Sequence, residues 1–283
     1  MESSKVELLK EILAVPSKTY DETLLVDYIC NYLADRGYNH KTDPKGNIYV
    51  TKGVAETYPM VMAHTDTVHR ITEMVVQEVF EKNTYGETKI ALKAFRKSDG
   101  MPCGIGGDDK AGIFICLQLL EMFDNIKVFL PVEEECGCTG SEEAVDYYPE
   151  FFDNIEYAIM FDSPQNDTMS QTLMGTELYD ENSVFFQESK QFILDHGIIK
   201  WQKHPYTDSM VMRKTFGFQT LNLAAGYYNY HTAGEYVVID DVQNAIDLGH
   251  KIISNLNSKN YVVEKTKFEY SSIDEDDDYA FLF

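Results

Sequence analysis

Four short apolar segments of the chain are each followed by side chains that can bind a metal ion or move a proton. In chain order these are Met60–Ala63 followed by His64 and Asp66, Val128–Val132 followed by Glu133, Glu134 and Glu135, Tyr157–Phe161 followed by Asp162, and Thr220–Ala225 followed, after a tyrosine-rich loop, by His231. Imidazole and carboxylate groups are ligands of zinc and of related divalent ions. Four such endings in one chain are hard to attribute to chance, and they predict a metal centre.

A fifth carboxylate group lies in the glycine-rich segment Gly104–Gly112, where Asp108 and Asp109 precede Lys110. An aspartate at the start of a helix often serves only as its N-cap. That role accounts for one carboxylate but not for two in a row. A phosphate-binding loop is a poor alternative, because the residue order is not that of a P-loop and the acids would repel a phosphate.

The apolar segments that precede these groups have the length of buried strands, and helical patterns lie between them. The pattern also predicts a strand at Ile48–Thr51, a β-rich excursion over residues 71–98, and helices at Ala111–Phe123, Glu181–His196 and from Asp240 to Asn255. Strands that alternate with helices form a mainly parallel sheet covered on both faces. The predicted fold class is therefore α/β, with three α/β/α layers around a central mixed, mostly parallel sheet. Such sheets gather their sites at the carboxyl ends of the strands.

The charge of the chain excludes two classes of partner. Asp and Glu number 47 against 24 Lys and Arg, so the formal net charge is −23. Nucleic acids and anionic membranes need a cationic face, so we expect neither as a partner. We see no signal peptide, and no apolar run approaches the roughly 20 residues of a membrane span. The five cysteines are odd in number and lack a framework spacing. These features predict a cytoplasmic protein.

Five motifs occur along the chain in an order that resembles a known group of enzymes. They are His64-Thr65-Asp66-Thr67-Val68, Gly107-Asp108-Asp109-Lys110-Ala111-Gly112, Glu134-Glu135-Cys136-Gly137, Phe161-Asp162 and His231-Thr232. Each is weak alone, but together their order is specific. The chain is similar in this respect to the clan of co-catalytic di-zinc aminopeptidases and deacylases. Its members include peptidase T-like tripeptidases, acetylornithine deacetylase-like enzymes, and lid-less leucine and glutamyl aminopeptidases. The resemblance covers roughly residues 5–255 and implies the zinc-peptidase, phosphorylase/hydrolase-like fold.

The resemblance implies a role for each matching residue. Asp108 would bridge two divalent metal ions, His64 and Asp162 would complete one ion site, Glu135 and His231 would complete the other, Glu134 would be the general base, and Asp66 would orient His64 from behind. Two histidines and three carboxylates suit zinc, with cobalt or manganese tolerated. Two ions about 3.5–4 Å apart need one shared carboxylate. An acid beside a ligating acid can then take the proton of the attacking water.

The resemblance implies a hydrolase, and three functions stay open. The first is an aminopeptidase that acts on short peptides, whose protonated amino terminus the acidic charge would favour. The second is a metal-dependent deacylase or amidohydrolase of N-acylated amino acids or small metabolites. The third is a catalytically silent metal-binding scaffold, although the base and all five ligands are present. His204 and Asp208 are candidate substrate-binding residues, because they lie in a segment that resembles one near the substrate pocket of lid-less members. Tyr228 is a third candidate, because it shortly precedes His231, although packing explains it equally well.

The chain has room for one catalytic domain and a tail. Only 69 residues (231 − 162) separate Asp162 from His231. This interval is too short for the dimerisation lid of about 100 residues, the size of a small domain, that peptidase T-like relatives insert there. We therefore expect no separate lid domain, a single catalytic metallopeptidase domain over residues 1–270, and an acidic, disordered tail over 271–283. The sequence leaves a homo-oligomer open.

Overall fold

The structure is a computed structural model that describes residues 1–82, 86–173, 175–203, 207–256 and 261. The candidate substrate-binding residue His204 and the predicted tail, residues 271–283, lie outside these ranges. The predicted domain boundary at residue 270 also lies outside them and stays a prediction.

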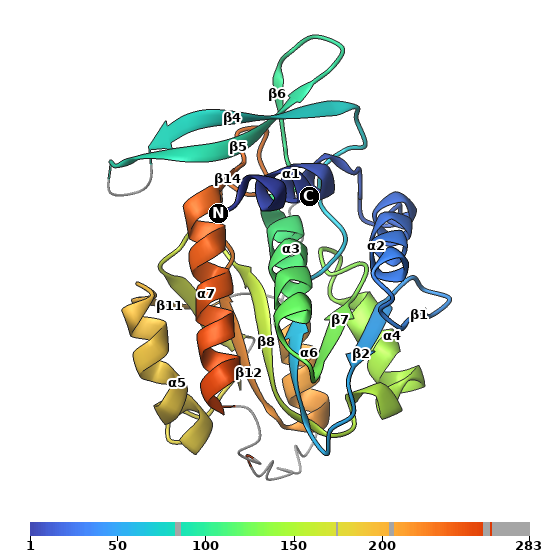
Figure 1. Cartoon of the computed structure of the whole chain (residues 1–283), viewed down its shortest axis with the longest axis vertical. Coiled ribbons are helices and arrows are strands. Elements are labelled where there is room, and N and C mark those ends of the chain that lie inside the picture. The colour runs from blue at the N-terminus through green and yellow to red at the C-terminus, as the bar shows by residue number, and fades with distance from the viewer. Residues whose placement is uncertain (83–85, 174, 204–206, 257–260, 262–283) are drawn as a thin grey trace, which may run out of the picture.

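A nine-stranded mixed sheet forms the centre of the molecule (Figure 1). Its four central strands are parallel and follow the order β7 (Ile126–Leu130), β3 (Tyr58–Met62), β8 (Ile155–Ser163) and β12 (Gln219–Ala224). Antiparallel β2 (Ile48–Lys52) and β1 (His40–Thr42) extend it beyond β7, and β9 (Thr168–Leu173), β10 (Thr176–Glu177) and β11 (Lys200–Lys203) extend it beyond β12. The predicted α/β fold with a mixed sheet is confirmed.

Three of the four central strands are buried along their whole length, and β12 is buried at all but its first residue, because helices cover both faces of the sheet. Every residue of β3, β7 and β8 is buried. Side chains alternate between the faces, so Val61 and Ala63 join one apolar core while Met60 and Met62 join the other. This double burial explains why the sequence shows continuous apolar runs there rather than an alternating pattern.

The two cores define three layers. The larger core packs the sheet against α1 (Ser3–Ala14), α2 (Thr23–Asp35), α3 (Gly107–Met122), α5 (Val184–Asp195) and α7 (Ile239–Leu256). The smaller core packs it against α4 (Thr139–Tyr147), the short 3₁₀ helix η1 (Pro149–Phe152) and α6 (Asp208–Phe216). Apart from Tyr227–Tyr228, the helices and strands described between Asp162 and His231 belong to these layers, which agrees with the absence of a separate lid domain. No helix within the described ranges is both long and apolar enough to span a membrane.

A second, five-stranded sheet lies across one end of the helices, at the top of Figure 1. It consists of β4 (Met74–Lys82), β5 (Thr88–Arg96), β6 (Pro102–Cys103), β13 (Tyr227–Tyr228) and β14 (Tyr236–Val238). The predicted β-rich excursion over residues 71–98 is the antiparallel β4–β5 hairpin. Strand β5 of this hairpin pairs with β14 and also with β6, the strand that leads to Asp108.

Candidate metal centre

The predicted ligands come together where the central parallel strands end. His64 follows β3, Glu135 follows β7, and Asp162 is the penultimate residue of β8. The Nε2 atom of His64 lies 3.5 Å from Oδ1 of Asp162 and 3.2 Å from Oδ1 of Asp108. The His64 imidazole is 1% exposed. These three residues therefore form a buried group at the base of the site.

The second histidine lies on the other side of Asp108. The Nε2 atom of His231 is 2.8 Å from Oε1 of Glu135 and 3.3 Å from Oδ2 of Asp108. The two oxygens of Asp108 thus face two different histidines, Oδ1 towards His64 and Oδ2 towards His231. A carboxylate that bridges two cations presents its oxygens in this way.

The five-stranded sheet positions both Asp108 and His231. Strand β6 ends at Cys103, and the turn that follows it leads to Asp108 at the start of α3. His231 lies in the connection between β13 and β14, where its own backbone has a φ of 61°. A left-handed backbone is uncommon for a residue other than glycine and often marks a functional site.

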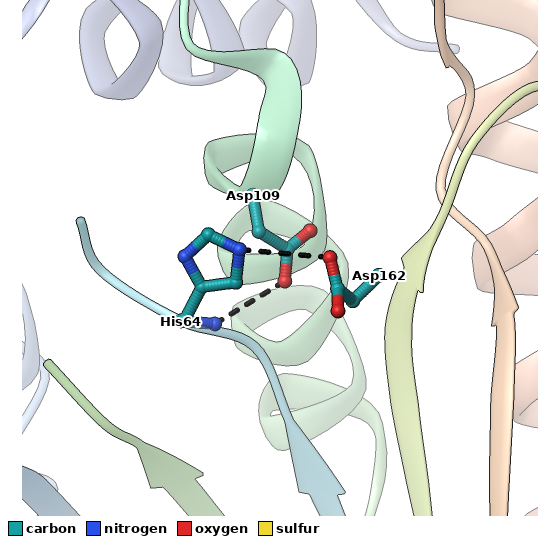
Figure 2. A group of neighbouring side chains, drawn as sticks. All are labelled: His64, Asp109 and Asp162. Carbon is teal, nitrogen blue, oxygen red and sulfur yellow. Dashed lines mark hydrogen bonds and ion pairs between the residues drawn. The ribbon is translucent and has the colours of Figure 1, made fainter. Parts of the chain in front are cut away.

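Two groups of three residues could each hold a metal ion, because the ligand atoms within each group lie within 4.8 Å of one another. One comprises His64, Asp108 and Glu135, and the other comprises His64, Asp109 and Asp162. Figure 2 shows the second set, with Asp109 and Asp162 both facing the His64 residue. The donor types and their spacing fit divalent cations such as zinc.

Asp109 is a member of the cluster that the prediction did not assign. It is fully buried, and its carboxylate accepts the backbone N–H of His64 at 3.2 Å and that of Gly112 at 3.2 Å. Asp109 therefore holds the backbone of the candidate ligand His64 in place. The signal was present in the sequence, since two adjacent acids exceed what one helix cap requires.

Asp66 connects the histidine to the two glutamates. Its buried carboxylate accepts the backbone N–H of Glu134 at 2.8 Å and of Glu135 at 3.2 Å, and the Thr19 hydroxyl at 2.9 Å. The Nδ1 atom of His64 lies 3.0 Å from the carbonyl oxygen and 3.3 Å from Oδ1 of Asp66. The contact with the His64 ring is thus one of several that Asp66 makes. Asp66 also holds the backbone of Glu134, the candidate base.

Glu235 is a second residue that the prediction missed. It has no exposed surface, and it accepts the backbone N–H groups of Gly106 at 2.9 Å and Asp108 at 3.0 Å. Its Oε2 atom also lies 2.5 Å from Nε2 of His69. Glu235 thus holds the turn that presents Asp108. The only hint of Glu235 in the sequence was its position, as an acid four residues after the candidate ligand His231.

The carboxylates and histidines of the cluster perturb one another strongly. Burial raises the pKa of Glu134 well above its usual range, and burial also raises the pKa of Glu135. Contacts with Asp108 and Glu135 raise the pKa of His231 to about 10. Burial acts to lower the pKa of His64, but its carboxylate neighbours outweigh this and raise it. A cation placed among these carboxylates would favour their charged forms and offset the cost of burying them.

Of the candidate substrate-binding residues, the structure describes Asp208 and Tyr228, and neither belongs to the two sets of candidate ligands. Asp208 begins α6 and has no exposed surface, and burial raises its pKa to about 7. Tyr228 is 4% exposed, stacks on Tyr236 and donates its hydroxyl to Asp241 at 2.6 Å. Neither side chain presents a polar atom to solvent beside the candidate ligands.

Solved structures of peptidases share this architecture. A tripeptidase from Staphylococcus aureus is similar with a TM-score of 0.65 and 14% identity, over 89% of this chain and 97% of that one. Aminopeptidase PepT from Bacillus cereus has a TM-score of 0.66 and 14% identity, over 88% and 97% of the two chains. An aminopeptidase from the archaeon Desulfurococcus kamchatkensis has a TM-score of 0.62 and 13% identity, over 94% and 99%.

The chain has the fold of these peptidases. No protein-family model matches its sequence, and no curated protein is significantly similar to it. At these identities the likeness concerns the fold alone, so an argument for function depends on the residues of the site.

Proposed function

We propose that this protein is a di-metal hydrolase of peptide bonds, acting as an aminopeptidase on short peptides. The observation that carries the proposal is the position of Asp108, whose two carboxylate oxygens face His64 and His231. One shared carboxylate between two histidine-containing groups is what a pair of co-catalytic ions requires. The fold shared with aminopeptidases and tripeptidases supports the same conclusion.

The residues fit two divalent ions, for which we propose zinc. Asp108 would be shared, His64 and Asp162 would hold the inner ion, and Glu135 and His231 would hold the outer ion. Bound at these residues, the ions would supply the positive charge that acidifies a water molecule and polarises the scissile carbonyl. Asp109 and Asp66 would keep the His64 backbone and ring in place.

Glu134 is the general base of the proposed reaction. It is 8% exposed, and its backbone N–H is bound by Asp66, so its position is set within the cluster. Burial raises the pKa of its carboxyl group, which strengthens it as a proton acceptor. Glu134 takes one proton from the attacking water and returns one to the leaving amine, which balances the hydrolysis.

We further propose that the protein acts in the cytoplasm and on peptides with a free amino terminus. The five cysteines are all unpaired, which suits a reducing compartment. The negative charge of the chain favours a protonated amino group. A homo-oligomer is part of the proposal, because one structural relative is described as a dodecamer and another as a peptidase that assembles into a tetrahedron or an octahedral shell.

The substitution Glu134→Gln tests the proposed base. It should leave the metal content near that of the wild type and lower turnover by at least about 100-fold, the usual contribution of general acid–base catalysis. The matched control is Glu142→Gln, because Glu142 is an exposed glutamate in the following helix, α4. Metal analysis and a peptide-hydrolysis assay provide the two measurements. Full activity in Glu134→Gln would exclude Glu134 as the base.

A peptide panel separates the aminopeptidase from the alternative deacylase. Peptides with free and with acetylated amino termini should be compared before and after chelation, with zinc, cobalt or manganese restored. Cleavage of free but not blocked peptides supports the aminopeptidase. The reverse preference supports the deacylase, and no metal-dependent cleavage of either kind supports the silent scaffold.

A further inference from the structure

A cavity lies near the opposite end of strand β7 from the candidate metal centre. Its volume is about 820 Å³, within the range of small-molecule sites. Residues of β1, β2 and β7 and of the segment from Tyr148 to Phe151 line it. Lys127, the second residue of β7, faces this cavity, whereas Glu134 and Glu135 follow the other end of the same strand. None of the residues that line the cavity belongs to the metal cluster.

The cavity contains a cation whose hydrogen bonds are incomplete. Lys127 is 6% exposed, and its ammonium group donates to the carbonyl oxygens of Phe151 at 2.5 Å and Asp153 at 2.9 Å. An ammonium group has three N–H donors, so one is left for a further acceptor. Among the described residues no carboxylate lies within ion-pair distance of Lys127; burial lowers its pKa to about 8, and the charge of Asp153 offsets this effect only in part. An anion in the cavity would supply both the missing acceptor and the missing charge.

Aromatic rings form the walls around this ammonium group. The Lys127 Nζ atom lies 5.1 Å from the ring centre of Tyr58 and 5.0 Å from that of Phe151. The Tyr49 ring packs against Phe151 at 5.0 Å and against Tyr148 at 5.8 Å. A pocket with apolar walls and one placed charge recognises a small molecule that has an apolar part and an opposite charge.

Two carboxylates, Asp43 and Glu150, also line the cavity, but neither forms an ion pair with Lys127. Asp43 accepts the backbone N–H groups of Lys45, Gly46 and Asn47, the Asn47 side-chain amide and the Tyr49 hydroxyl, so its oxygens are already occupied. Glu150 is exposed, where water and salt screen its charge.

We propose that this cavity binds a small carboxylate that carries an aromatic or large aliphatic group. The carboxylate accepts the third N–H of Lys127, and the apolar group packs against Tyr148 and Phe151. The carboxyl-terminal residue of a short peptide that ends in phenylalanine has this chemistry. The inference does not depend on the proposed hydrolase, because the cavity and the metal cluster share no residue.

Titration of the full-length protein with 3-phenylpropanoate tests the proposal by calorimetry or by changes in the NMR spectrum. Two matched probes are 3-phenylpropanamide, which lacks the charge, and acetate, which lacks the ring. We expect saturable binding of 3-phenylpropanoate and binding of both control probes that is at least about tenfold weaker, since a hydrogen bond to a charged group is lost or the buried apolar area is missing.

The substitution Lys127→Met should weaken the binding of 3-phenylpropanoate by at least about tenfold. Lys52→Met is the matched control and should leave binding unchanged. Lys52 also donates to a backbone carbonyl, that of Leu120 at 2.9 Å, and lies 5.3 Å from the ring centre of Tyr38, but it does not line the cavity.

Comparison of the variants decides the location of the site, because a carboxylate also binds to divalent ions. Equal binding by wild type and Lys127→Met overturns the proposal, as does equal binding of the amide and the carboxylate, or no saturable binding at all. If Lys127→Met does not fold, Tyr148→Ala takes its place, and we expect at least about fivefold weaker binding from the lost ring contact. Unchanged binding in Tyr148→Ala would likewise overturn the proposal.

Discussion

The substitution Asp66→Asn removes one charge from the centre of the site and keeps the shape of the side chain. In the wild type, Oδ1 of Asp66 accepts the backbone N–H of Glu134 and lies 3.3 Å from Nδ1 of His64. The other oxygen accepts the backbone N–H of Glu135 and the Thr19 hydroxyl. Three hydrogen-bond donors and the His64 ring nitrogen therefore surround one carboxylate that has no exposed surface.

The expected cost follows from these contacts. The asparagine oxygen can serve only one side, so its NH₂ group must face the donors on the other side. The Thr19 hydroxyl can rotate, but a backbone N–H cannot. If the amide faces Glu135, that N–H loses its acceptor. A buried N–H without a partner costs about 1–3 kcal/mol, and the other bonds lose their charge assistance. We expect the free energy of unfolding to fall by about 2–4 kcal/mol, and metal affinity to fall by about 10–100-fold.

Urea denaturation measures the free energy of unfolding, and competition with a chelator measures the zinc affinity. Asp43→Asn is the matched control, because the Asp43 carboxylate accepts three backbone N–H groups and the Tyr49 hydroxyl but contacts none of the candidate metal ligands. It should lose comparable stability and keep its metal affinity. The reasoning is refuted if Asp66→Asn unfolds like the wild type, or if both variants lose metal affinity equally.

Three further outcomes follow from the structure. The His231 side chain is 42% exposed and that of His64 is 1% exposed, so a limiting chelator should remove the outer ion first, and metal analysis that shows both ions leaving together would contradict this order. Gly112→Ala should yield little folded protein by circular dichroism, because its Cβ would collide with the carbonyl oxygen of Phe161, and a wild-type melting curve would contradict this expectation. The pKa of Lys127 is lowered to about 8 in the folded protein and is about 10.4 when unfolded, so the unfolded chain binds more protons between these values. The wild type should therefore gain stability relative to Lys127→Met as the pH rises from about 8 to about 10.4. If the urea midpoint of the wild type minus that of Lys127→Met stays constant or falls over this range, the expectation is wrong.

The sequence predicted the central strands because each is buried on both faces and ends in a polar group. The apolar runs at Met60–Ala63 and Val128–Val132 each share three residues with β3 and β7, and His64 and Glu134 follow them. In a parallel sheet this local pattern has a global consequence, since all such ends meet at one edge. Hence the grouping of the candidate ligands was accessible without coordinates.

The supporting residues were not accessible in the same way. Asp109 and Glu235 act on backbone N–H groups, and such contacts leave no periodic trace in a sequence. The helices α4 and α6 were also missed, although their packing against one another and against β8 and β12 covers the second face of the sheet. Both have only nine residues, which is too short for a clear amphipathic pattern.

The second sheet shows most clearly what pattern analysis cannot supply. Residues 71–98 are recognisable as β structure, but their purpose depends on partners more than 100 residues away, since Leu92 in β5 pairs with Val237 in β14. The same strand pairs with β6, which leads to the turn before Asp108. One hairpin thereby sets the distance between Asp108 and His231, the contact on which a shared ion pair depends. The central sheet positions the inner group of ligands, whereas the outer group needs both sheets. This division explains why the inner histidine is rigidly enclosed and the outer one remains partly exposed.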